Sequence, residues 1–182
     1  MIKVMTKITN QGLTAGLKIV EKMKINNAVI SFRETIQGEE TDVVDLVLNV
    51  FSEFVAPHFS EDGIFEFKKF VNTSSLEERF QSGNPIIVAL LKNEIIGVIE
   101  IRENSHIALF FVGKPYQKKG VAKKMFCEAI KICRKRNPDI QRFTVNSSPN
   151  AYSAYQNFGF QGENVTETVN GIRFIPMGFE LN

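Results

Sequence analysis

The stretch GKPYQKKGVAKKM, residues 113–125, places one glycine among lysines directly before a segment with helical periodicity. The residues before it, HIALFFV (106–112), are β-branched and aromatic and predict a strand. A strand, a glycine turn and a helix together can bind phosphate, because the first helical turn leaves about four backbone N–H groups unpaired and its dipole attracts anions. Gly120 would let the backbone approach such an anion closely. A second interpretation stays open at this point: a simple turn followed by a solvated basic face.

The segments on both sides of this stretch predict a mixed α/β chain with hairpin strands in its centre. Upstream, the patterns predict a strand at 28–35, a helix within 37–54, short helices within 60–72 and 74–80, and strands at 85–92 and 94–102. A serine precedes Glu77 and Glu78 in the second short helix in the manner of a capping box. Downstream, they predict a helix at 121–136, a strand at 140–146, a short helix at 149–158 and a last strand at 171–181. No repeat or low-complexity linker interrupts this order, so we expect one folded domain.

Composition excludes several classes of protein. With 182 residues and 43% apolar side chains, the chain can bury a full core. A formal charge of +2 is too mild to indicate a nucleic-acid partner. Cys127 and Cys133 lie within one helical segment and the two histidines lie far apart, so neither a disulfide framework nor a metal site is expected. These features predict a protein of the reducing cytoplasm, without a signal peptide or a membrane span.

The first 27 residues form a segment of different character. They precede the first predicted strand and contain a stretch, 14–24, that we interpret as a helix. We therefore expect an N-terminal extension at 1–27 and the folded domain at 28–182.

A second group of residues decides between the two interpretations of the opening stretch. VNSSPNAYSAYQNFGF, residues 145–160, contains a strand end, a Ser-Ser-Pro turn and a helix that carries Tyr152 and Tyr155. The two stretches together resemble the acetyl-CoA signature of the GNAT superfamily of N-acetyltransferases. The matching positions are Val112, Gln117-x-x-Gly120-x-Ala122, Ser148-x-x-Ala151-x-x-x-Tyr155 and Gly159-Phe160. The resemblance covers roughly residues 28–181 and is strongest within 106–160.

The resemblance implies a fold and an activity. The fold would be an α/β (α+β) domain with a mixed, mostly antiparallel, twisted sheet of about six to seven strands and helices on both faces. The activity would be acetyl-CoA-dependent N-acetylation, in which a primary amine attacks the thioester directly in a ternary complex. An alternative is a module that has kept acyl-CoA binding but lost transfer, and that acts as a sensor or partner subunit.

The resemblance also assigns residues to acetyl-CoA. The pantetheine arm would pair with the main chain of the strand that ends at Val112, and the pyrophosphate would bind the amides that follow it. The implied cofactor-binding residues are Phe110, Phe111, Val112, Gln117, Lys118, Lys119, Gly120, Val121, Ala122, Asn146, Ser148 and Ala151. Gln117 stands where many relatives have arginine, and Ala122 replaces a frequent glycine. Lysines at 118, 119, 123 and 124 could compensate for the missing arginine.

Acetyl transfer requires an acid for the thiolate and a base for the amine. By its position in the resemblance, Tyr155 would be the acid, whereas Tyr152 would be structural. Glu100, Glu103 and His106 lie around the third and fourth strands, and none has a diagnostic spacing. The base stays open between Glu100 and His106. Asn146 and Ser148 would bond the pantetheine amides or cap the next helix.

The acceptor site is expected between the first helix, the loop VAPHFSEDG (55–63) and the last strands. His58, Glu61 and Asp62 could attract an amine, and Phe54, Phe59 and Phe65 could form apolar walls. The sequence does not choose among small-molecule and peptide amines, such as a polyamine, an amino acid, an aminoglycoside or a protein N-terminus. It also leaves open whether the chain is a monomer or a homodimer.

Overall fold

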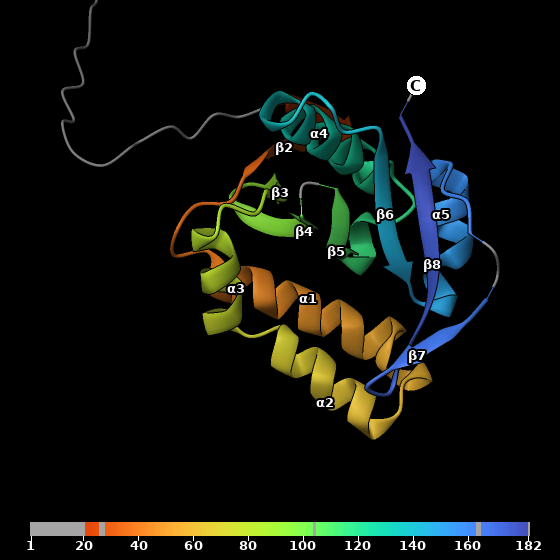
Figure 1. Ribbon diagram of the computed structural model, residues 1–182. Coiled ribbons are helices and arrows are strands. Elements are labelled where there is room, and N and C mark those ends of the chain that lie inside the picture. Colours follow the sequence, from red (N-terminus) through yellow and green to blue (C-terminus); the bar gives the residue numbers. More distant parts are fainter. Residues whose placement is uncertain (1–20, 26–27, 104, 163–164, 182) are drawn as a thin grey trace, which may run out of the picture.

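A twisted eight-stranded sheet forms the centre of the protein (Figure 1). The computed structural model describes residues 21–25, 28–103, 105–162 and 165–181. The strand order is β1-β2-β3-β4-β5-β6-β8-β7, and all neighbours are antiparallel except β5 and β6, which are parallel. The strands are β1 Glu21–Ile25, β2 Ala28–Glu34, β3 Ile86–Leu91, β4 Glu94–Arg102, β5 His106–Val112, β6 Arg142–Ser147, β7 Glu167–Val169 and β8 Ile172–Glu180.

Helices cover both faces of this sheet, as the resemblance implied. One face carries α1 Glu40–Phe54, α2 Glu61–Phe70 and α3 Thr73–Gln81, and the other carries α4 Val121–Arg136 and α5 Tyr152–Phe158. Short 3-10 turns lie at η1 Ala56–His58, η2 Lys114–Tyr116 and η3 Pro149–Ala151. We call the two sides the α1–α3 face and the α4 face.

The apolar spacing of the helices explains the two hydrophobic cores. In α1, Val43, Val47 and Phe51 recur every four residues and are fully buried. In α4, Met125 and Ala129 recur in the same way. Strand β3 is buried on both faces, which accounts for its continuous apolar sequence. The sheet is therefore a wall between two packed layers, and its centre is inaccessible to solvent.

Three local expectations differ from the structure. The helix expected at 14–24 is wrong over 21–24, which belong to β1, and residues 14–20 lie outside the described part. Met23 pairs with Ile30 across the edge of the sheet, and this long-range pairing overrides the weak helical pattern. The short strand β7 raises the strand count above seven. Asn72 caps α3, because its side chain accepts from the Ser75 amide, so the serine of the expected capping box does not begin that helix.

Strand β1 comes from the segment that we expected to be an N-terminal extension. It pairs with β2 and also contacts α4 through Glu21, which forms ion pairs with Lys124 at 3.0 Å and Lys131 at 3.1 Å. These ammonium groups lower the pKa of Glu21 to about 2. The last residues of the segment are thus part of the sheet. Among the described residues, no helix is long and apolar enough to cross a membrane.

Candidate active site

The parallel strands β5 and β6 separate soon after they meet. They pair only at His106 with Thr144 and Ile107 with Val145. The register between β4 and β5 then shifts, so that Ala108 becomes an extra residue on β5. Beyond this bulge, β5 continues to pair with β4 but not with β6, and its other edge is open within the described residues. The expected cofactor-binding residues Phe110, Phe111 and Val112 lie along this open edge.

The turn after β5 presents an uncapped helix N-terminus. Gly120 is the N-cap of α4, adopts the left-handed conformation with φ +82°, and leaves the first amides of the helix without a side-chain cap. Lys118 also has a positive φ of 57°. When left-handed residues alternate with residues of negative φ, successive backbone N–H groups turn toward one side, where an anion can bind. The turn therefore has a backbone geometry that suits an anion.

Two contacts hold this turn in place. The side-chain amide of Gln117 donates to the carbonyl oxygen of Val112 at 2.9 Å, which ties the turn to the end of β5. A Cβ built on Gly120 would lie 3.2 Å from Cε of Met23, so β1 lies against the other side of the turn. The side chain of Gln117 thus positions the loop and is not free to replace an arginine.

The lysines around the turn differ in their surroundings. Lys118 and Lys119 are exposed. Lys124 instead forms ion pairs with Glu21 and with the fully buried carboxylate of Glu128, which is 3.5 Å away. Lys131 also bonds Glu128, at 2.9 Å. The compensating charge expected from Lys124 is therefore already neutralised by carboxylates.

Tyr155, on α5, is buried in the core on the α4 face and contacts β5 through Phe110. Its ring lies 6.2 Å from that of Phe110 and 5.3 Å from that of Phe160. Burial raises the pKa of the Tyr155 hydroxyl well above its usual value, so the phenol keeps its proton. Tyr152 has another role, because its hydroxyl donates to the carbonyl of Gly162 at 3.3 Å.

The residues expected on the opposite side of the gap lie at the end of β6. Asn146 is exposed and pairs with Pro176 of β8. Ser148 begins η3 without a side-chain capping bond, and Ala151 follows at its end. The hydroxyl of Ser148 is therefore not used in a cap.

The two candidates for the base have different environments. Glu100 has no exposed side-chain surface, and it accepts from Arg79 Nε at 2.8 Å and from Asn84 at 3.3 Å. It lies on the α1–α3 face, held in a buried ion pair. Its carboxylate points neither to solvent nor to an open cleft.

His106 is half-buried at the point where β5 and β6 begin to separate. Its Nδ1 lies 2.9 Å from Oγ1 of Thr144. Phe143 and Val145 belong to the core on the α4 face, so Thr144 between them faces the α1–α3 side, and His106 lies with it. Burial lowers the pKa of His106, with a smaller opposing effect of Glu103. The imidazole is therefore neutral near pH 7 and can accept a proton.

The expected acceptor loop contacts the β7–β8 turn. Ser60 Oγ donates to the carbonyl of Gly171 in the β7–β8 turn at 3.2 Å. A Cβ on Gly63 would lie 2.8 Å from the carbonyl carbon of Gly171, so the two backbones are in direct contact. Asn150, after β6, donates to the carbonyl of Phe54 at 2.8 Å. The end of α1 is therefore joined to the turn after β6, and the start of α2 to the β7–β8 turn.

Four of the six side chains expected around the acceptor site are exposed to solvent. His58, Glu61, Asp62 and Phe65 are exposed. Phe59 packs edge-on against Phe51 at 5.7 Å and belongs in part to the core. Among the described residues, no group of three or more histidine, cysteine or acidic side chains could hold a metal ion.

Sequence reasoning missed the partners of these residues. Thr144 and Arg79 carry no motif, and their contacts depend on strand register and on helix placement. The open edge of β5 had one signal, the run of large side chains before Gly113, but the bulge at Ala108 had none.

The comparisons with known proteins agree with this geometry. The model of the acetyltransferase (GNAT) domain family matches residues 55–181. No curated protein matches the chain. A GCN5-related N-acetyltransferase from Rhodopseudomonas palustris is 18% identical with a TM-score of 0.70, covering 82% of this chain and 94% of its own.

Two further solved structures have the same fold. The PaiA N-acetyltransferase from Thermoplasma acidophilum, in complex with coenzyme A, is 20% identical with a TM-score of 0.69, covering 84% of this chain and 99% of its own. A ribosomal-protein-alanine N-acetyltransferase from Brucella melitensis is 16% identical with a TM-score of 0.61, covering 82% and 99%.

Proposed function

The chain belongs to the GNAT acetyltransferase family, and from this premise we propose that it transfers the acetyl group of acetyl-CoA to a primary amine by direct attack in a ternary complex. The observation that carries the proposal is the gap between β5 and β6, which opens beside the uncapped N-terminus of α4. Such a gap offers one unpaired strand edge and one anion site to a single elongated ligand. A structure similar to this one was solved with coenzyme A.

The residues fit acetyl-CoA in two places. The open edge at Phe110–Val112 can pair with the amides of a pantetheine arm in the manner of an added strand. The amides from Gln117 to Ala122, with Gly120 left-handed, can bind the pyrophosphate. Acetyl-CoA supplies the acetyl thioester and a thiol leaving group. Asn146, Ser148 and Ala151 lie at the end of β6 and complete the other wall.

His106 is our proposal for the base. The attacking amine must lose a proton as its nitrogen bonds to the acetyl carbon, and His106 is neutral and lies on the α1–α3 face at the point where the gap begins. Thr144 holds one ring nitrogen, which leaves the other for this proton. Glu100 is less suitable because its carboxylate is buried against Arg79.

Tyr155 is our proposal for the acid. The carbon–sulfur bond breaks as the carbon–nitrogen bond forms, and the departing thiolate takes up a proton. Burial keeps the Tyr155 hydroxyl protonated, and the contact of its ring with Phe110 holds it beside the open edge of β5. A backbone N–H along this edge would stabilise the negative charge on the thioester oxygen.

The amine would enter from the α1–α3 face, between η1, the start of α2 and the β7–β8 turn. The exposed side chains of His58, Glu61 and Asp62 give this rim a net acidic character, which favours a cationic amine over an anionic one.

The proposal is tested by incubating the protein with acetyl-CoA and a panel of amines, with free thiol as the readout. The panel contains a polyamine, an amino acid amide, an aminoglycoside and a peptide with a free N-terminus, and a reaction without amine corrects for hydrolysis. We expect thiol release that depends on at least one amine and a product that is heavier by one acetyl group. Binding of coenzyme A without turnover on any amine would instead support the binding module.

A further inference from the structure

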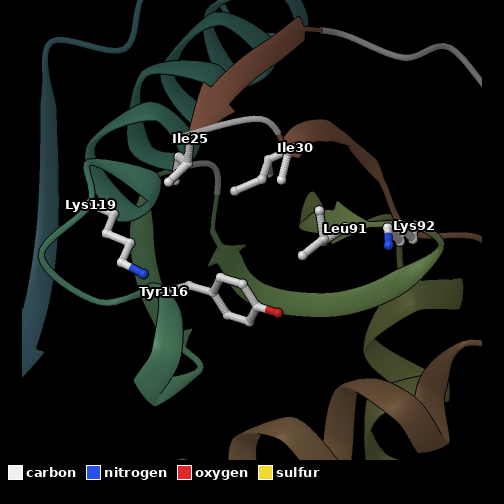
Figure 2. A pocket seen from close by; sticks show the side chains of 7 residues that line it. Ile25, Ile30, Leu91, Lys92, Tyr116 and Lys119 are labelled. Atoms are coloured by element: carbon white, nitrogen blue, oxygen red, sulfur yellow. The ribbon is translucent and has the colours of Figure 1, made fainter.

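A cavity of about 420 Å³ lies between the sheet edge and the turn before α4. Figure 2 shows its walls: Ile25, Ile30 and Leu91 lie on one side, and the ring of Tyr116 lies across from them. Ala28 also lines it. Its volume is within the range of small-molecule sites, and most of its surface is aliphatic or aromatic. An apolar tail or ring of moderate size would fill it.

Two positive charges mark the rim of this cavity. Lys92, in the β3–β4 turn, and Lys119, in the turn before α4, extend their side chains from opposite sides (Figure 2). Within the described part of the chain, neither ammonium group forms an ion pair with a carboxylate. The phenol of Tyr116 lies between them and adds a hydrogen-bond donor. The rim is therefore suited to an anion.

Two lysines of α4 are used differently. Lys124 and Lys131 are bound to Glu128 of the same helix and to Glu21, which attaches β1 to α4. Strand β1 thus forms a fixed wall of the cavity through Ile25, while Lys92 and Lys119 keep their charge for a ligand. The apolar walls and the two rim lysines together select a molecule that has both an acidic group and an apolar body.

We propose that this cavity binds a small amphiphilic carboxylate, with the apolar part between Ile30, Leu91 and Tyr116 and the carboxylate at Lys92 and Lys119. The site adjoins the phosphate loop through Lys119, whose amide belongs to that loop and whose side chain lines the cavity. It lies on the β3–β4 side of β5, whereas the gap proposed for acetyl-CoA opens on the β6 side. The inference therefore does not depend on acetyl transfer.

The probe is octanoate, added to the full chain labelled with ¹⁵N, in the absence of coenzyme A. Octan-1-ol and octylammonium are the matched controls, since they carry the same tail with no charge or with the opposite charge. We expect saturable shifts of the amide signals of Ile30, Leu91, Lys92 and Lys119 with octanoate, and weaker binding of both controls. Equal affinity for octanoate and octan-1-ol would overturn the proposal, as would shifts confined to other residues.

Substitutions test separately how the lysine charges and the cavity volume contribute to octanoate binding. Lys92→Ala and Lys119→Ala should each weaken octanoate binding by about two- to fivefold, and the double variant by about tenfold. Ala28→Leu, which fills the cavity, should abolish the shifts, with thermal unfolding as the check of folding. Lys22→Ala, on an exposed position of β1 outside the cavity, is the control and should bind octanoate as the unchanged chain does. Undiminished binding by the double lysine variant would refute the assignment of the carboxylate.

Discussion

Replacement of Arg79 by alanine should destabilise the protein more than any exposed charge change. Arg79 bonds Glu100, whose side chain has no exposed surface, at 2.8 Å. The same guanidinium donates to the carbonyls of Phe70 and Ser75 at 3.0 Å each and lies 4.1 Å from the centre of the Phe70 ring. Its removal leaves a carboxylate buried without its cation, and the carbonyl oxygens of Phe70 and Ser75 lose the guanidinium as a donor.

The size of the effect follows from these contacts. Removal of one partner of a buried ion pair costs about 3–5 kcal/mol in the free energy of unfolding. For a domain of this size, that lowers the melting temperature by about 6–20 °C. In urea, the midpoint should fall with little change in the slope. Lys69→Ala, which removes a surface pair with Glu66 at 3.8 Å, is the control and should change stability by less than about 0.5 kcal/mol.

A double substitution tests whether the buried charge of Glu100 causes this loss of stability. The pair Arg79→Met with Glu100→Leu should regain more than half of the loss, because no buried charge remains. Glu100→Gln should leave the acetyl-transfer rate close to that of the unchanged chain, since the carboxylate serves the fold. A loss below about 1 kcal/mol in Arg79→Ala, or a hundredfold fall in rate with intact stability in Glu100→Gln, would refute the reasoning.

Four further predictions concern the site. Tyr155→Phe should lower kcat by roughly 10²- to 10⁴-fold while the melting temperature stays within a few degrees, because the ring keeps its aromatic contacts; an unchanged kcat would exclude the acid role. Since His106 has a lowered pKa, kcat/KM should rise with pH with a midpoint below the usual histidine value of about 6.5, and His106→Ala should remove this rise; a rise that survives in the variant belongs to another group. Gly120→Glu should abolish coenzyme A binding in calorimetry and cost about 1–2 kcal/mol in stability, because φ is +82°; retained affinity would contradict the phosphate site. Gly63→Ala should raise KM for the amine more than for acetyl-CoA, because a Cβ would meet Gly171 at the carbonyl carbon, 2.8 Å away; equal changes in both constants would argue against an acceptor site there.

Most of the secondary structure could be predicted from local pattern. The buried positions of α1 and α4 recur at helical spacing, and the hairpin strands β3 to β5 are separated by short polar turns. Strand β1 could not be predicted, because its five residues favour a strand only when β2 lies beside them. The α3 cap was missed since Asn72 precedes two equally suitable serines.

The site was less predictable than the fold. The turn at Gly120 follows from its own sequence, but the environment of Glu100 does not. Its neighbours in the sheet are Ile86 and Leu109, and its cation comes from a helix 21 residues earlier. The hydrogen bond of His106 to Thr144 joins strands 38 residues apart in sequence. Contacts of this kind arise from register and packing, which local patterns do not contain.

The contact between Gly63 and Gly171 has a consequence for how the specificity of this protein could diverge. Two loops more than 100 residues apart in sequence meet there through backbone alone, with one side-chain bond from Ser60 beside them. The exposed neighbours His58 and Glu61 lie outside the close contacts of these two glycines, and Asp62 approaches Gly171 through its Cβ. Mutation can therefore change their charge and size without separating the loops. Descendants of this protein would keep the contact between the two loops. Single substitutions at the neighbouring exposed positions would then change which amines the proposed acceptor site binds.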